Sequence, residues 1–240
     1  MTDFDRNAFF TLHADLPREG PGEPADVAWA AQMAGVTAQA RILDAACGPG
    51  GDIAALLAAI PQGHVTGIDL HAPFIAAARA QWHNTPRVTL LTGDMTTPQG
   101  IFDFIWCAGA VYFLGIEAAL TAWRGRLAPG GAVAFSEPCF FTDAPSDGAR
   151  AFWDGEGHVG TEDDIAKRIA AVGYKMMATR RLSSAAWEAY YKPQAARIAK
   201  LRPTADAALS TVLDTAEREA TLWRTHKTET GYVLIVARPG

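Results

Sequence analysis

A glycine-rich segment carries the clearest chemical signal in this sequence. Residues 42–52 read ILDAACGPGGD, so an apolar run ends at the acidic Asp44, and Gly48 and Gly50 precede a helical pattern. Glycines let the backbone approach a ligand closely, and the free N–H groups of a helix N-terminus can bind its polar atoms. The segment therefore predicts a ligand site at the end of a buried strand.

Two kinds of ligand compete for this loop. A dinucleotide site of the G-x-G-x-x-G type would need a third glycine at position 53, which is Ile53, and Asp44 would add like charge beside a pyrophosphate. A cationic amino-acid ligand reverses the electrostatic argument, because Asp44 would then lie near an ammonium and a sulfonium. The loop favours the second ligand, and a nicotinamide-dependent reductase is the weaker alternative.

Two further carboxylates follow the next two apolar runs. Asp69 comes about twenty residues after the loop, the spacing at which a carboxylate accepts both ribose hydroxyls. Asp94 ends the third run and could accept a hydrogen bond from an adenine amino group. Taken singly, each is more often a helix cap. Together with Asp44 they fit one nucleoside lying across the carboxyl edge of a sheet.

The elements that position these residues alternate along the chain. Helices are expected at 25–34, 53–60, 73–83 and 117–127. Strands are expected at 41–45, 64–70, 87–91, 103–107 and 132–136. This alternation predicts a parallel sheet with helices on both faces.

The second half of the chain departs from this alternation of helices and strands. A capping box at 161–164 opens a helix that Gly173 ends, and strands are expected at 174–182 and 232–238. The block between these strands carries an apolar stripe at helical spacing, which predicts a helical cap. We therefore expect one domain over 1–240. It divides into an N-terminal arm and helix (1–36), a ligand-binding core (37–182), a cap insertion (183–229) and a last strand (230–240).

Composition restricts the class of protein. Hydrophobic residues make up 49% of the 240 and charged residues 20%, which excludes a disordered chain. The net charge of −5 argues against nucleic acid as a partner. The three cysteines show no CxxC spacing and no HExxH motif is present, so no metal is expected. No apolar run is long enough to cross a membrane, and the acidic start lacks a signal peptide, which predicts a cytoplasmic protein.

The combined motifs resemble those of the class I S-adenosylmethionine-dependent methyltransferases. Residues 44–50 are similar to the family's D-x-G-C-G-x-G loop, with Ala46 in place of the first glycine. Residues 67–69 and 93–95 match the later motifs, and 127–131 resemble the turn before strand five. The resemblance covers roughly 37–182 and the final strand. It implies an α/β fold with a doubly wound, mostly parallel seven-stranded sheet of order 3-2-1-4-5-7-6, whose last strand is antiparallel.

The resemblance also implies a cofactor and the residues that bind it. The donor would be S-adenosylmethionine and the product S-adenosylhomocysteine. The residues expected at the donor are Asp44, Ala46, Cys47, Gly48, Gly50, Asp69, Leu70, Asp94, Met95 and Cys107.

The acceptor side is less constrained by motifs. Methyl transfer from a sulfonium is a displacement that expels a neutral thioether, so the protein mainly aligns the reactants and excludes water. A base is needed only for an acceptor that must lose a proton. Residues 107–110 read CAGA, which differs from the Asp/Asn-Pro-Pro-aromatic motif of methyltransferases that act on amino groups of nucleic acids and proteins. That class is therefore disfavoured.

Candidate acceptor residues come from the arm, the strand ends and the cap. Segments 103–112, 140–143 and 187–193 resemble a group of bacterial small-molecule methyltransferases. Glu137 is expected after strand five, as a base or as a solvated loop carboxylate, and the aromatic residues either line a pocket or pack the cap. The catalytic candidates are Glu137, Tyr112 and His13. The substrate-binding candidates are Arg18, Trp106, Trp187, Tyr190 and Tyr191.

The sequence thus predicts methyl transfer from S-adenosylmethionine to a small molecule. The alternative is a non-catalytic protein that binds S-adenosylmethionine as a sensor or partner module. We expect a small-molecule partner, with neither nucleic acid nor membrane, and the sequence leaves a homodimer open.

Overall fold

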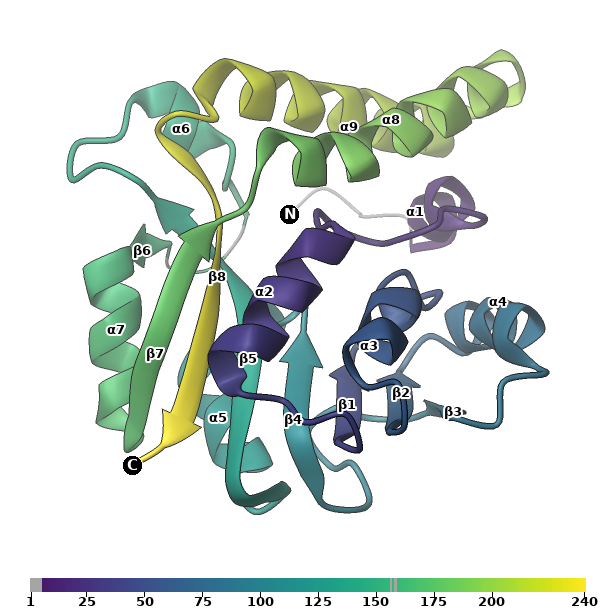
Figure 1. Ribbon diagram of the computed structural model, residues 1–240. Helices are drawn as coiled ribbons and strands as arrows, with labels where there is room; N and C mark the ends of the chain where they lie inside the picture. Colours follow the sequence, from purple (N-terminus) through teal and green to yellow (C-terminus); the bar gives the residue numbers. More distant parts are fainter. Residues whose placement is uncertain (1–5, 156, 158) are drawn as a thin grey trace.

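A computed structural model describes residues 6–155, 157 and 159–240, so the first five residues of the predicted arm lie outside the described residues. Its centre is a sheet of order β3-β2-β1-β4-β5-β8-β7, with β6 paired to β5 (Figure 1). The strands are β1 (Arg41–Ala45), β2 (His64–Asp69), β3 (Val88–Thr92), β4 (Phe102–Cys107), β5 (Leu127–Phe140), β6 (Gly160–Thr161), β7 (Tyr174–Arg181) and β8 (Thr230–Pro239).

The observed topology confirms the predicted strand order. β1 to β5 pair in parallel, while β8 runs antiparallel between β5 and β7. The sixth and seventh predicted strands are thus β7 and β8. The difference is the two-residue strand β6, which pairs with the end of β5 and which the sequence analysis did not predict.

Helices cover both faces of the sheet, as the alternation predicts. α2 (Pro24–Ala34), α3 (Ile53–Ala59) and α4 (Ala72–Trp82) pack on one face, and α5 (Ile116–Arg124) and α7 (Glu162–Ala171) on the other (Figure 1). Within the described residues, none of the helices is long and apolar enough to cross a membrane.

β5 is longer than predicted. The expected strand at 132–136 in fact spans Leu127–Phe140. Leu127 pairs with Phe102 of β4 at its start, and β8 pairs with β5 continuously from Val133 to Phe140. The prediction that Glu137 follows this strand was therefore wrong, since Glu137 lies within it and opposite Val233. The antiparallel pairing with β8, which is distant in sequence, thus determines where β5 ends.

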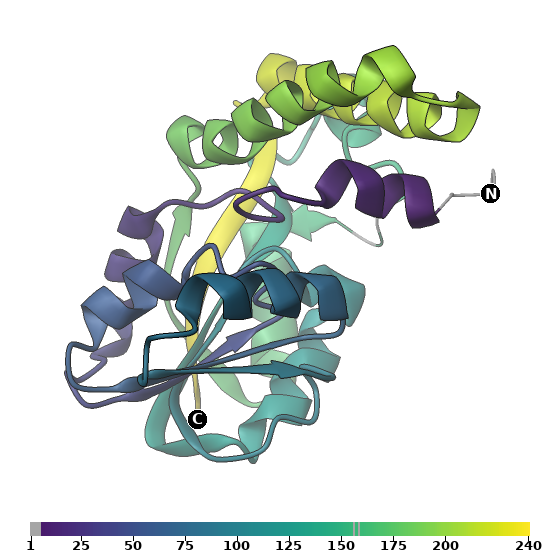
Figure 2. The ribbon, with the colours of Figure 1, turned by 90° about the vertical axis from the view of Figure 1, so that its right-hand side faces the viewer.

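The predicted cap consists of two long helices. α8 (Ser184–Leu201) and α9 (Ala207–His226), joined by the short η2 (Arg202–Thr204), run side by side across the carboxyl edge of the sheet (Figures 1 and 2). β8 returns from α9 into the sheet. The cap therefore lies over the edge where Asp44 and Asp69 end their strands.

The arm contains a helix that the sequence analysis did not predict. α1 (Arg6–His13) lies between the cap and the core (Figure 2), and its Leu12 packs in one buried cluster with Ile198 and Leu213. The short helices α6 (Asp147–Ala151) and η1 (Val111–Phe113) were also missed. Helices this short depend on tertiary contacts, which local sequence patterns do not contain.

Candidate functional site

The glycine loop after β1 adopts the left-handed backbone conformation that its glycines permit. Gly48 and Gly50 have φ of +53° and +88°, a region that glycine enters without a steric penalty. Ala46 also lies there, at φ +58°, although alanine enters it only at a cost. Ala46, at the position where the family that the chain resembles has glycine, thus adopts a conformation that glycine would enter without this cost.

Asp69 at the end of β2 holds this loop. Its Oδ2 accepts a hydrogen bond from Gly48 N at 2.9 Å, and its Oδ1 accepts one from His71 N at 2.7 Å. A carboxylate oxygen can accept more than one hydrogen bond, so each oxygen can still accept a ligand hydroxyl. The arrangement leaves Asp69 suited to the ribose role that its spacing predicts.

Asp44 provides an observation that tests the fit of a cationic donor. Its side chain is 3% exposed, and its Oδ2 has no hydrogen-bond partner among the described residues. Burial, followed by the nearby charges of Asp52 and Asp69, raises the pKa of Asp44 well above its ordinary value. A buried carboxylate oxygen without a partner suits an ammonium or sulfonium, so this residue fits the predicted ligand.

The other residues predicted at the donor take different positions around the loop. Leu70 is 73% exposed beside Asp69, which makes it available to an apolar ring. Asp94 is exposed, and its Oδ1 accepts hydrogen bonds from the backbone and hydroxyl of Thr96. The side chains of Cys47, Met95 and Cys107 are buried in the core.

The arm packs directly on the glycine loop. A Cβ at Gly51 would lie 2.8 Å from the Pro17 carbonyl oxygen and 2.9 Å from Arg18 Cβ, so glycine is required for this close approach. The Arg18 guanidinium donates to the Gly20 carbonyl and to Asp52 Oδ1 at 3.3 Å. The arm is therefore part of the loop's packing.

Arg18 and Trp106, both predicted to bind substrate, meet at Asp52. Trp106 Nε1 donates to Asp52 Oδ2 at 3.0 Å, on the opposite side of the carboxylate from Arg18. The Trp106 ring is buried among the residues under α2, α3 and α4. These contacts favour a role in supporting the loop.

Glu19 is a site residue that the sequence analysis missed. A Cβ at Gly48 would lie 3.2 Å from Glu19 Cγ, so this side chain covers the loop. Its Oε2 contacts His13 Nδ1 at 2.5 Å, while Oε1 is buried without a partner among the described residues. The sequence placed Glu19 in the arm beside Arg18, but no motif around it indicates that its side chain faces the loop.

His13 contacts Glu19 directly, whereas Tyr190 of the cap lies within electrostatic range of Glu19. Tyr190 is buried and close enough to Glu19 and Tyr112 for their charges to raise its pKa, although desolvation is the larger cause. Gln194 Nε2 donates to the Tyr190 hydroxyl at 2.9 Å. Two hydrogen-bonded pairs, His13 with Glu19 and Tyr190 with Gln194, thus lie within electrostatic range of each other and of Tyr112, and we call these five residues the arm–cap cluster.

Trp187 and Tyr191 lie inside the cap. Trp187 stacks with Trp223 at a centroid distance of 5.0 Å and with Tyr232 at 5.1 Å. The Tyr191 hydroxyl donates to Glu219 Oε1 at 2.9 Å. These contacts join α8, α9 and β8, which supports the packing alternative for these two residues.

Glu137 is buried on the α5 and α7 face of the sheet. Its Oε1 lies 3.7 Å from Arg168 Nη1, and its Oε2 has no hydrogen-bond partner among the described residues. Burial raises the pKa of Glu137 to about 7, against the opposing effect of Arg168. A carboxyl group with this pKa can exchange a proton near neutrality.

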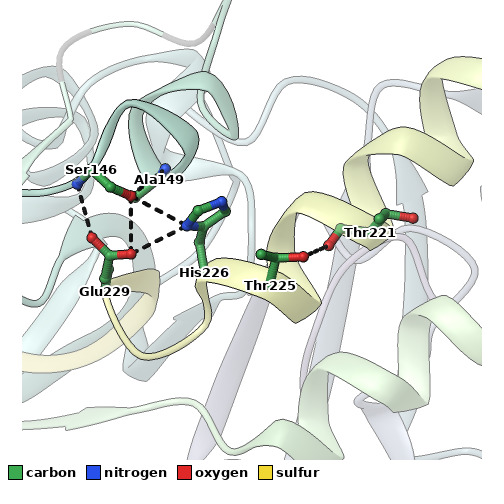
Figure 3. Close-up of polar contacts among 6 residues, drawn as sticks. All are labelled: Ser146, Ala149, Thr221, Thr225, His226 and Glu229. Atoms are coloured by element: carbon green, nitrogen blue, oxygen red, sulfur yellow. Dashed lines mark hydrogen bonds and ion pairs between the residues drawn. The ribbon is translucent and has the colours of Figure 1, made fainter.

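Ser146, His226 and Glu229 group together away from this site (Figure 3), with the composition of a hydrolase triad. The same nitrogen, His226 Nδ1, lies 3.3 Å from Ser146 Oγ and 3.2 Å from Glu229 Oε1. A triad histidine uses opposite nitrogens for the nucleophile and the acid. This cluster therefore caps α6 and ties it to the loop between α9 and β8.

Comparison with known families identifies the core. Residues 42–131 match the family model described as a methyltransferase domain. This segment contains the glycine loop, Asp69 and Asp94. The predicted resemblance to the class I S-adenosylmethionine-dependent methyltransferases is thus confirmed, and with it the fold class.

The curated relatives match this chain over only part of its length. A trans-aconitate 2-methyltransferase from Deinococcus radiodurans is 34% identical over 101 residues, which cover 41% of this chain and 38% of that protein. The alignment therefore spans well under half of this curated relative.

Solved structures with low sequence identity share the whole fold. A methyltransferase from Geobacter sulfurreducens in complex with S-adenosylhomocysteine has a TM-score of 0.81 at 18% identity, covering 98% of both chains. The cyclase SpnF has a TM-score of 0.73 at 16% identity, covering 99% of this chain and 93% of that one. The methyltransferase domain and its cap thus form a fold that also occurs in a protein named for different chemistry.

Proposed function

We propose that this protein transfers a methyl group from S-adenosylmethionine to a small-molecule acceptor. The observation that carries the proposal is the glycine loop held by Asp69, with the unpartnered and buried Asp44 oxygen beside it. The bound donor would supply an electrophilic methyl group. Asp44, the loop backbone and Asp69 would hold its cationic and ribose parts.

The closed carboxyl edge supports a small acceptor. The arm contacts the loop at Gly48 and Gly51, and α8 places Tyr190 near Glu19. A site that arm and cap cover would exclude water and would suit a compact molecule better than a polymer. The name of the trans-aconitate relatives agrees with a small-molecule acceptor.

A non-catalytic role as a donor-binding module is the second candidate. The similarity to SpnF is relevant to it, because that protein has this fold and is named a cyclase, so the fold alone does not require methyl transfer. The two functions differ in whether bound donor is consumed.

Calorimetry followed by a transfer assay separates them. We expect S-adenosylhomocysteine to bind the purified protein, and a metabolite extract supplied with methyl-labelled donor to yield a labelled small molecule. Binding without any transfer would favour the module. Failure to bind S-adenosylhomocysteine would remove the proposed function.

A further inference from the structure

We propose that the acceptor is a small primary or secondary amine, bound by the Glu19 carboxylate within the arm–cap cluster. This inference rests on the proposed function and adds the chemical class of the acceptor. It comes from the sign of the charge and the kind of polar atoms that the arm, η1 and α8 bring together.

Glu19 offers a free acceptor atom at the boundary between donor loop and cap. Its side chain is 21% exposed, Oε1 itself is buried and unpartnered, and Oε2 is engaged with His13. Its aliphatic part covers Gly48, whereas its charge is felt by Tyr190 of α8. A ligand that donates an N–H would satisfy Oε1, whereas a ligand that offers only acceptor atoms would not.

The charged neighbours of this position do not favour an anion. Within the described part of the chain, the ionised groups that act on the Glu19 carboxylate are those of His13, Asp69 and His71, with no lysine or arginine among them. The nearest arginine in sequence, Arg18, points to Asp52 instead. A carboxylate acceptor would therefore face Glu19 and Asp69 without a strong cation to bind it.

The remaining members of the arm–cap cluster suit a compact amine. Tyr190 is 8% exposed and Gln194 2% exposed, so their polar atoms lie in the interior. The aromatic faces of tyrosines attract cations by their ring quadrupoles. Tyr190 and Tyr112 therefore add a second feature that favours a positive ligand.

The same residues account for the proton balance of the reaction. An amine bound as an ammonium must lose one proton before its lone pair can attack. The N–C bond then forms as the C–S bond breaks, and the electron pair of that bond stays with sulfur as a neutral thioether. The ammonium proton passes to the Glu19 carboxylate, whose pKa is already raised by burial, and His13 lies in contact to share it.

The experiment compares two probes of equal shape and opposite charge. Phenethylamine and 3-phenylpropionate are titrated by calorimetry into the full-length protein, with and without saturating S-adenosylhomocysteine. Tyramine and butylamine extend the amine set, and trans-aconitate the acid set. Glu19→Gln and Tyr190→Phe are the test variants. Asp15→Asn is the control, because Asp15 lies on the same arm but its side chain is 81% exposed.

We expect at least one amine to bind, and the acids at least tenfold more weakly. Glu19→Gln should lower amine affinity at least tenfold, Tyr190→Phe several-fold, and Asp15→Asn less than twofold. S-adenosylhomocysteine affinity should stay within twofold in all three variants, which also shows that they fold.

Acids binding as well as amines, or no amine binding at all, would overturn the proposal. So would a Glu19→Gln variant that loses S-adenosylhomocysteine while keeping amine affinity, since Glu19 would then belong to the donor site. A protein that does not bind S-adenosylhomocysteine would fail the proposed function instead, and the titrations without it would still decide the amine question.

Discussion

Asp69 has two roles that one substitution can separate. Its carboxylate holds the loop through Gly48 N and His71 N, and we propose that it also binds the donor ribose. Asp69→Asn keeps one oxygen acceptor but removes the charge. Because a hydrogen bond to a charged group contributes about 1.5–3 kcal/mol, we expect S-adenosylhomocysteine affinity to fall at least tenfold by calorimetry.

Asp103→Asn is the matched control for that measurement. Asp103 lies on β4 and pairs with Arg41 at the start of β1, the opposite end of that strand from the loop. Its substitution should leave the affinity unchanged. If the Asp69→Asn variant also binds S-adenosylhomocysteine with unchanged affinity, Asp69 only holds the loop and does not bind the ribose.

Ala46 stores backbone strain that glycine would release. At φ +58° an alanine costs about 1–2 kcal/mol relative to its preferred conformations. The greater freedom of glycine in the unfolded chain offsets part of this gain. We expect Ala46→Gly to raise the free energy of unfolding by about 1 kcal/mol in a urea titration. Ala76→Gly in α4 should lower it by a similar amount, and a drop at both positions would contradict the strain argument.

At the scale of elements, α1 bridges the cap and the donor side of the core. Phe10 stacks on His71 at a centroid distance of 3.7 Å, next to Asp69, while Leu12 packs under α8 and α9. We expect Phe10→Ala to loosen α1 from the core. Stopped-flow displacement should show S-adenosylhomocysteine leaving at least threefold faster, since an aromatic pair contributes about 0.5–1.5 kcal/mol.

Met177→Ala provides the comparison for this variant. Met177 is a similarly large apolar side chain, 45% exposed on β7 and away from α1. Its loss should not change the dissociation rate. Equal rates in both variants and the parent protein would show that α1 does not restrain the donor.

The stability of the whole molecule should depend on pH through Glu137. Its pKa is about 7 in the folded protein against an ordinary value of 4.5, so the folded state holds this proton more tightly than the unfolded chain. The free energy of unfolding therefore falls as pH rises from 4.5 to 7. Glu137→Gln removes this contribution, which corresponds to at most about 3 kcal/mol.

Urea unfolding at pH 5 and pH 8 measures that contribution. We expect Glu137→Gln to gain stability relative to the parent protein on going from pH 5 to pH 8. Glu188→Gln should not, because Arg224 holds the pKa of Glu188 below its ordinary value of 4.5. Parallel pH profiles for parent and Glu137→Gln would mean that Glu137 stays ionised in the core.

The sequence by itself determined the alternation of helices and strands and the donor loop. Each of these depends on local patterns: an apolar run, a glycine turn and a carboxylate at a strand end. Asp44 and Asp69 could be placed because parallel strands bring their carboxyl ends to one edge. The strand order came from the resemblance, since periodicity does not determine which strand pairs with which.

Only the tertiary structure decided the acceptor side. β5 extends past its local signal because β8 pairs with it, so Glu137 lies inside a strand. Trp106 turned out to support the loop through Asp52, and Trp187 to pack the cap. The charge of Glu19 acts on Tyr190 and raises its pKa although some 170 residues separate them, a proximity that arises only when arm and cap lie over the same edge. Such contacts arise from long-range packing, which no pattern within a short window of sequence contains.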